Sequence, residues 1–244
     1  MGKRTFIYID GLNLYRGILE QRPRYKWLDL IAFSKRIVGQ KYCVEKVKYF
    51  TAIVEPFLDP GQPKRQRDYF GALKKCYPQM LQVIEGSFAL RLKYYRKAIR
   101  LNPRNLPSTL EGQPLPPQPA CEENGFYYYS SKSGVEVIRP EEKGSDVNLA
   151  AHLVNDASKG QYETALVISN DSDLVEAMRI ARDEWRKEIL WTNPTLAHGR
   201  RRKGAKEFRQ FGFKEKKIWR GSLKNSQLPD KIGGTNIERP SVWR

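Results

Sequence analysis

The sequence predicts an α/β protein whose mainly parallel sheet carries helices on both faces. Three observations predict it. Short apolar segments rich in β-branched residues alternate with segments of helical spacing along most of the 244 residues. The first apolar segment, residues 4–9, ends at Asp10 and Gly11, as a buried strand that enters a loop does. A basic, proline-rich stretch at about residues 89–140 interrupts the alternation and is expected to be an insertion.

The elements before the insertion follow from hydrophobic spacing. Alternation of bulky side chains indicates strands, and apolar residues three or four apart indicate helices. The last helix of this part is basic and must end before Pro78, because proline cannot continue a helix. The expected elements are a strand at 4–9, helices at 12–20 and 28–38, a strand at 46–54, a helix at 62–77 and a strand at 81–88.

The insertion has three parts. Residues 91–104 carry six cations and no acid, and residues 103–119 contain six prolines, which predicts an extended loop. Residues 125–138 are expected to form a hairpin, with tyrosine-rich and valine-rich arms around a turn at 131–134.

After the insertion the alternation returns. Ser145 is expected to cap a helix that runs to about residue 158. The segment 222–244 is rich in Gly, Pro and Asn and is expected to wrap the surface as a tail, which leaves residues 1–221 as the domain. The other expected elements are strands at 165–168 and 188–191 and helices at 172–181 and 204–211.

The charge of the chain is unusual. Forty-four Lys and Arg residues against 27 Asp and Glu residues give a formal net charge of +17. Such an excess favours a polyanionic partner, because each neutralised phosphate releases counterions. No segment is long or apolar enough to span a membrane. The three cysteines, Cys43, Cys76 and Cys121, form no CxxC pair, so a reducing cytoplasm is the expected location.

Three acids stand where an α/β sheet carries its chemistry. Asp10 follows the first strand and Asp171 follows the strand at 165–168, so both are expected at the carboxyl edge of the sheet. Asp146 shares a helix face with Leu149 and Leu153, which predicts a core-facing acid that requires a partner. Asp156 lies off that face and is expected at the surface.

Carboxylates held close together repel one another, and a hard divalent cation relieves the repulsion. Oxygen ligands without nearby His or Cys select Mg²⁺ or Mn²⁺ rather than zinc. Such an ion can activate water and polarise a phosphodiester. The acids together with the basic composition therefore predict phosphodiester hydrolysis.

Three local sequences occur in the order Tyr8-Ile-Asp10-Gly-Leu-Asn13-Leu-Tyr15, Glu142-Lys-Gly-Ser-Asp146-Val-Asn-Leu-Ala-Ala151 and Ile168-Ser-Asn-Asp171-Ser-Asp173-Leu174. Together they resemble the NYN domain family, a branch of the PIN-like nuclease superfamily. The segment 226–230, followed by Pro240 and Trp243, also resembles the ending of stand-alone members. The resemblance covers most of the chain and is weakest across residues 89–140.

The resemblance implies a Rossmann-like sheet and a ribonuclease that depends on Mg²⁺ or Mn²⁺. Carried over by motif, Asp10, Asp146 and Asp171 are both catalytic and metal-binding. Asn13 is implied to orient a metal-bound water or a neighbouring acid, and Asp173 to act as a fourth acid or a helix cap. Glu142 and Ser169 are further candidates beside them. Two alternatives stay open: an inactive RNA-binding module of the same fold, and a nuclease that acts on DNA.

RNA is the expected partner, and the sequence specifies neither a protein partner nor an oligomeric state. Tyrosines interleaved with cations suit the stacking of unpaired bases beside a phosphate backbone. The expected nucleic-acid-binding residues are Arg91, Lys93, Tyr94, Tyr95, Arg96, Lys97, Arg200, Arg201, Arg202 and Lys203.

Overall fold

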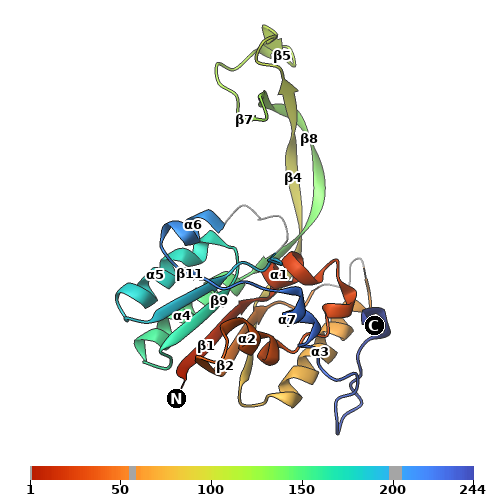
Figure 1. The fold of residues 1–244 in the computed structure, drawn as a ribbon. Coiled ribbons are helices and arrows are strands. Elements are labelled where there is room, and N and C mark those ends of the chain that lie inside the picture. Colours follow the sequence, from red (N-terminus) through yellow and green to blue (C-terminus); the bar gives the residue numbers. More distant parts are fainter. Residues whose placement is uncertain (1, 55–58, 198–204) are drawn as a thin grey trace. The chain divides into compact units, whose positions relative to one another are not determined.

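A computed structural model of the chain describes residues 2–54, 59–197 and 205–244 (Figure 1). It contains a six-stranded sheet with the order β11-β10-β9-β1-β2-β3, in which every neighbouring pair is parallel. No helix in these ranges is long and apolar enough to cross a bilayer. The strands of the sheet are β1 (Lys3–Asp10), β2 (Tyr42–Thr51), β3 (Leu81–Glu85), β9 (Thr164–Ile168), β10 (Glu188–Thr192) and β11 (Lys214–Glu215).

This strand order determines where a ligand can bind. Numbered along the chain, the six strands lie in the order 3-2-1-4-5-6, which is compatible with a Rossmann-like fold. The order reverses between β1 and β9, which pair directly from Thr5 with Thr164 to Ile9 with Ile168. Ligands of such sheets bind outside the carboxyl ends of the strands at this reversal. The side chains that follow β1 and β9 are therefore the first candidates for a site.

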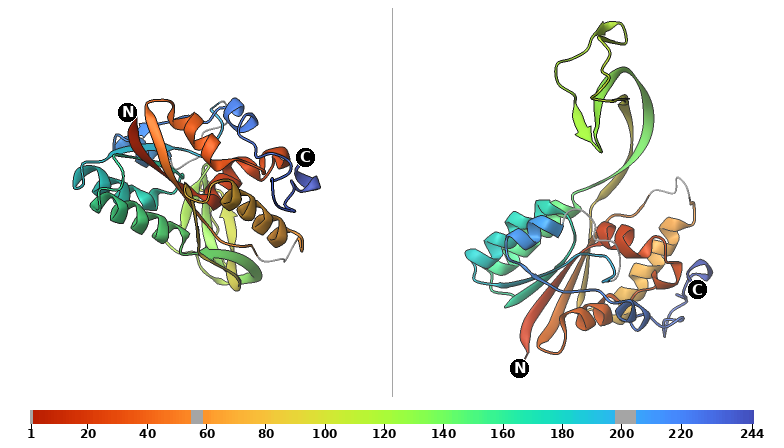
Figure 2. Two further views of the ribbon diagram at one scale, coloured as in Figure 1. Left: turned by 90° about the horizontal axis from the view of Figure 1, so that it is seen from below. Right: turned by 45° about the horizontal axis from the view of Figure 1, so that its top comes forward.

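Helices cover both faces of the sheet, as the sequence predicts (Figure 2). Along β1, Phe6 and Tyr8 join the core under α4 (Ser145–Ser158) and α5 (Val175–Asp183). Ile7 and Ile9 join the opposite core under α2 (Leu30–Val38) and α3 (Gln62–Cys76). Successive side chains of a strand point to opposite faces, so one strand supplies both cores. The α/β class is confirmed.

The loop after β1 depends on a glycine. The helix expected at 12–20 begins as α1 (Gly11–Leu14) and widens into the π-helical turn η1 (Tyr15–Leu19). A Cβ at Gly11 would lie 2.7 Å from the carbonyl oxygen of Phe50 and 2.8 Å from the ring of Tyr49. Only glycine allows β2 to approach this closely. The short helix η2 (Pro23–Tyr25) then leads into α2.

Residues Ala89–Glu141 form a compact unit of their own, and Met1–Phe88 with Glu142–Arg244 form the other. The cations at 91–97 lie in the strand β4 (Ser87–Leu101). The expected hairpin at 125–138 is wrong, because these residues belong to one strand, β8 (Phe126–Lys143). A Cβ at Gly134 would lie 2.3 Å from the Tyr95 carbonyl oxygen, so this glycine permits close strand contact and makes no turn. The sheet order is β4-β8-β7, with β7 at Cys121–Glu123; β5 (Thr109–Leu110) pairs with β6 (Gln113–Pro114).

The start of α4 also differs from the expectation. Ser145 is the first helical residue and not its cap, and its hydroxyl donates a hydrogen bond to the Glu142 carboxylate. Gly144 precedes it with φ of 91°, a left-handed conformation that favours glycine. The remaining helices are η3 (Ser172–Leu174), α6 (Ala205–Gln210), α7 (Arg220–Lys224) and η4 (Ser241–Trp243).

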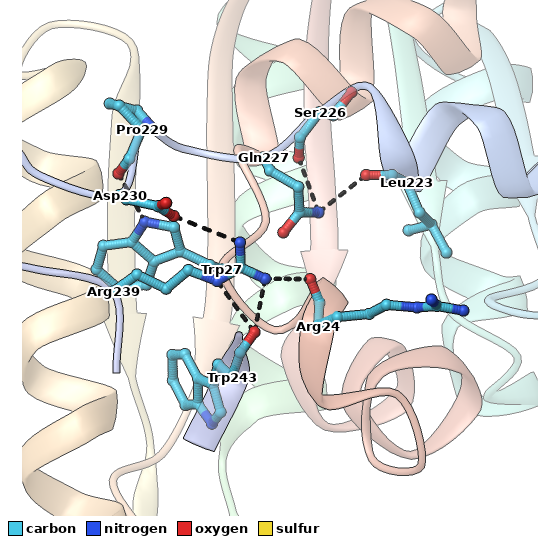
Figure 3. Close-up of polar contacts among 9 residues, drawn as sticks. All are labelled: Arg24, Trp27, Leu223, Ser226, Gln227, Pro229, Asp230, Arg239 and Trp243. Atoms are coloured by element: carbon cyan, nitrogen blue, oxygen red, sulfur yellow. Dashed lines mark hydrogen bonds and ion pairs between the residues drawn. The ribbon is translucent and has the colours of Figure 1, made fainter. Parts of the chain in front are cut away.

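The C-terminal segment is part of the core of its unit and more than a surface tail. Leu228 and Ile232 are buried. The Trp27 Nε1 donates to the carbonyl of Pro229 at 2.9 Å, and the Trp243 ring lies 6.1 Å from the Trp27 ring (Figure 3). The Arg239 guanidinium donates to the carbonyl oxygens of Arg24 and Trp243, which fastens the end of the chain (Figure 3).

Candidate functional site

Asp10 is the buried acid of the site. It ends β1, is 2 % exposed, and caps α1 by accepting the Asn13 backbone N–H at 2.9 Å. The Asn13 side-chain amide and the Ser169 hydroxyl both donate to its Oδ2, the latter at 2.8 Å. Burial raises the pKa of Asp10, and these hydrogen bonds oppose the shift. Asn13 therefore orients Asp10, one of the roles that the resemblance implies.

Ser169 connects Asp10 to the acid that follows β9. The backbone N–H of Asp171 donates to the Ser169 hydroxyl at 3.0 Å, and Asp171 accepts the N–H of Asp173 at 3.1 Å. The Ser169 carbonyl in turn accepts the Trp191 Nε1 at 2.7 Å. A single hydroxyl thus joins the ends of the two strands at the reversal of the sheet.

Asp146 lies in the first turn of α4, and its residue is exposed. Its pKa is raised to about 6. The largest cause is partial burial, which disfavours the charged carboxylate, and the charges of Asp10, Asp171 and Asp173 raise the pKa further. Because Asp146 is exposed, the prediction that its side chain faces the core is wrong. The first turn of α4 lies at the carboxyl edge of the sheet, where Asp146 is exposed and lies near the charges of Asp10, Asp171 and Asp173.

Glu142 is the fifth acid of the cluster. Burial raises its pKa, and the charge of Asp146 adds to the increase, while the Ser145 hydrogen bond and Arg16 act against it. Glu142 also raises the pKa of Asp10. The structure therefore brings the predicted acids together around the ends of β1 and β9, and the further candidate Glu142 lies with them.

The arrangement does not support the predicted Mg²⁺ or Mn²⁺ site at Asp10, Asp146 and Asp171. Among the described residues, no three His, Cys, Asp or Glu side chains are placed to hold a metal ion. Both carboxylate oxygens of Asp10 already accept hydrogen bonds. Burial and neighbouring charges instead raise the pKa values of Asp10, Glu142 and Asp146, which favours the protonated forms of these three acids.

A cavity of about 270 Å³ lies against this cluster. It shares Glu142 with the acids, and the buried Tyr49 on its wall has a pKa raised by burial and by the charges of Asp10 and Glu142. The sequence carries no signal for this cavity, because its walls come from segments far apart in the chain. Its aromatic walls are Tyr15, Tyr49, Tyr69, Phe70, Phe88 and Trp243.

A second missed feature is a buried ion pair. The Asp156 Oδ2 lies 2.5 Å from the Lys48 Nζ and accepts the Tyr8 hydroxyl at 2.6 Å. The expectation of a surface Asp156 is therefore wrong. His152 contacts the same ammonium, with 3.2 Å between Nζ and Nδ1. The sequence signal was a lysine inside an apolar strand, which requires an acid to pair with it.

The expected nucleic-acid-binding residues on β4 are all exposed. Lys93 pairs with Glu141 at 3.1 Å, the Tyr95 hydroxyl accepts Arg139 at 2.6 Å, and the Tyr94 hydroxyl donates to the Lys132 carbonyl at 3.4 Å. The second expected group lies outside the described residues; its members are Arg200, Arg201, Arg202 and Lys203.

No family model matches the chain. The 6-hydroxy-3-succinoylpyridine 3-monooxygenase HspA of Pseudomonas putida is 30 % identical over 259 aligned residues, which cover 98 % of this chain and 75 % of the enzyme. The chain belongs to the family of this monooxygenase. A Vibrio parahaemolyticus protein of unknown function is similar in structure, with a TM-score of 0.40, 14 % identity, and coverage of 78 % of this chain and 81 % of that one. A TM-score this low supports no argument.

The family corrects the functional prediction. A monooxygenase is an oxidoreductase, so the expected ribonuclease activity and the other nuclease alternatives are overturned. The Mg²⁺ or Mn²⁺ of a nuclease is overturned with them.

Proposed function

We propose that this chain is an oxidoreductase that oxygenates an acid-bearing hydroxypyridine or a closely similar aromatic ring. The observation that carries the proposal is the match to the Pseudomonas monooxygenase along 98 % of the chain. The aromatic cavity beside the acidic edge supports it, because flat rings bind well against aromatic walls.

The reaction class has a fixed balance. A monooxygenase cleaves O₂, transfers one oxygen atom to the substrate and reduces the other to water. Two electrons from a reductant, such as a nicotinamide or a reduced flavin, complete the balance together with two protons. Carboxyl groups with raised pKa values, as at this edge, are suited to holding and moving such protons.

A dinucleotide does not fit the crevice at the strand reversal. Dinucleotides bind there through a glycine-rich turn that lets the backbone approach the pyrophosphate. The turn of this chain, Asp10-Gly-Leu-Asn13-Leu, contains one glycine, and Glu142 and Asp146 place negative charge beside it. Such charge repels a pyrophosphate. A reductant of this class therefore binds elsewhere or acts from solution.

The acids take different roles in this proposal. Asp146, with a pKa of about 6, can exchange a proton with a ring hydroxyl near neutral pH. Asp10 is held in one orientation by Asn13 and Ser169. Burial and the charge of Asp10 raise the pKa of Asp146 most, and the charges of Asp171 and Asp173 raise it further.

The fold belongs, in this proposal, to the PIN-like branch of Rossmann-like folds. The order of the three motifs, together with the clustering of their acids, supports kinship with NYN domains. Such kinship does not require nuclease activity, because one fold can carry unrelated chemistries.

Two further proposals concern the surroundings of the protein. The net charge of +17 and the exposed cations of β4 support RNA as a binding partner. The three cysteines are free, which supports a cytoplasmic location.

Oxygen consumption tests the proposed activity. Purified protein is mixed with 6-hydroxy-3-succinoylpyridine and NADH, with and without added flavin, and O₂ uptake is followed with an electrode. We expect uptake that requires both substrate and reductant and that falls at least about tenfold in Asp146→Asn. Glu176→Gln, an exposed acid on α5, is the matched control. Uptake that is independent of the pyridine contradicts the proposal.

A further inference from the structure

We infer that the aromatic cavity beside Glu142 is the substrate site and that Lys26 binds the substrate's carboxylate. The inference rests on the proposed function, because it assigns the aromatic acid to a place in the molecule. It adds a binding site, a binding cation and an orientation, none of which follows from the family.

The walls of the cavity suit a single aromatic ring. Tyr49 and Phe70 meet edge to face with centroids 5.8 Å apart, and Tyr69 lies 5.8 Å from Phe70 and 6.3 Å from Trp243. Rings packed in this way hold one another in place and present a preformed aromatic surface. The volume of about 270 Å³ is near the lower end for ligand pockets, which suits a small ligand with a single ring.

Among the residues that the structure describes, Lys26 and Arg65 are the cations on the wall. Arg65 already pairs with Asp59, so its charge is balanced within the protein. The Lys26 ammonium instead donates to the Tyr15 hydroxyl at 3.1 Å and lies 5.0 Å from the centre of the Tyr15 ring. A neutral phenol holds the ammonium in position and leaves its charge for an anionic ligand.

The charges around the cavity also give the ligand an orientation. Glu142 repels a carboxylate, so the acid group of the substrate lies at Lys26 and away from Glu142. The ring of the substrate then lies at the side of the cavity that Tyr49 forms, next to Gly11 in the loop after β1. This orientation brings the ring, and not the acid chain, toward the carboxyl edge of the sheet.

The C-terminal segment completes the wall. Val242 and Trp243 line the cavity. The Arg239 guanidinium donates to the Trp243 carbonyl at 2.6 Å and to the Arg24 carbonyl at 2.5 Å, two residues before Lys26 (Figure 3). Arg239 therefore ties the aromatic wall to the segment that carries the cation, and it is a positioning residue for both.

The test is direct binding without turnover. Isothermal titration calorimetry of the full chain, without reductant, compares 6-hydroxy-3-succinoylpyridine with its methyl ester. The ester keeps the ring and removes the charge. We expect the wild type to bind the acid more tightly, and Lys26→Met to weaken acid binding by about tenfold to a hundredfold while ester binding changes little. Lys74→Met, an exposed lysine on α3, is the matched control.

Trp243 gives a second, independent readout. Ligand binding should quench tryptophan fluorescence in the wild type, and Trp243→Phe should lose most of that signal while its melting temperature stays close to that of the wild type. Equal affinity of the wild type for acid and ester, unchanged acid binding in Lys26→Met, or no binding of either ligand overturns the inference. Charge-dependent binding without oxygenation refutes the proposed function and leaves the site standing. Oxygenation with an unchanged KM in Lys26→Met refutes the site and leaves the proposed function standing.

Discussion

Removal of the Asp156 carboxylate should be among the most destabilising single changes in the unit formed by Met1–Phe88 and Glu142–Arg244. The side chains of Asp156 and Lys48 are only 3 % and 7 % exposed, and their charged atoms are 2.5 Å apart. Asp156→Ala leaves the Lys48 ammonium buried without its counter-charge and the Tyr8 hydroxyl without its acceptor. Breaking a buried pair from one side typically costs about 3–5 kcal/mol. For a domain of this size, that loss lowers the melting temperature by roughly 6–20 °C.

The assay is thermal and urea unfolding followed by circular dichroism. Asp183→Ala, which removes an exposed acid paired with Arg182, is the matched control and should change stability by no more than about 1 kcal/mol. The double variant Lys48→Met, Asp156→Leu removes both charges and should recover much of the loss, because apolar replacement of a buried pair is often close to neutral.

The result that would refute this reasoning is specific. If Asp156→Ala unfolds within about 1 kcal/mol of the wild type, Lys48 must find water or another partner at little cost. The pair would then not hold α4 against β1 and β2, and the placement of Asp146 at the crevice would need another cause.

Three further predictions follow from the carboxyl edge and from β4. Asp146→Asn should stabilise the protein at about pH 8. A raised carboxyl pKa disfavours the charged folded form, and this penalty is complete above about pH 6 and absent below 3.8. The shift corresponds to about 3 kcal/mol, which exposure and screening reduce to about 1 kcal/mol of expected stabilisation. At about pH 3 the penalty is absent, so the variant and the wild type should have the same free energy of unfolding. Gly11→Ala should cost about 1–3 kcal/mol, measured by urea unfolding, because its Cβ meets the backbone of β2. Replacement of the β4 cations by Ser should reduce the slope of RNA affinity against salt, measured by fluorescence anisotropy, by about 0.7 per lost phosphate contact; an unchanged slope contradicts RNA binding by β4. The cations replaced are Arg91, Lys93, Arg96 and Lys97.

The sheet was predictable because buried parallel strands have a local signature. Continuous apolar runs between helical segments identified all its strands except β11, whose two residues carry no such pattern. The positions of Asp10 and Asp171 followed from the same logic, since acids after parallel strands meet at one edge.

Contacts between distant segments were not predictable in this way. Helical spacing placed Asp146 in the core and Asp156 outside, and the structure reverses both. The angle of a residue around a helix does not reveal where the helix passes the edge of the sheet. The cavity joins Lys26, Arg65 and Trp243, which no spacing rule connects.

The chemistry was the least predictable part. A cluster of carboxylates suits metal binding, proton transfer or plain repulsion, and side-chain types alone do not separate these. The +17 charge favoured a polyanionic substrate, although the net charge of a protein does not determine the chemistry of its site.

Isotope labelling tests the central claim most directly. Purified protein is incubated under ¹⁸O₂ with 6-hydroxy-3-succinoylpyridine and the reductant that supports O₂ uptake, and the product is analysed by mass spectrometry. The account predicts a product that carries one ¹⁸O atom, with the second atom of O₂ recovered in water. A product whose new oxygen comes from H₂¹⁸O, or a pyridine that stays unchanged while the reductant is consumed, contradicts it.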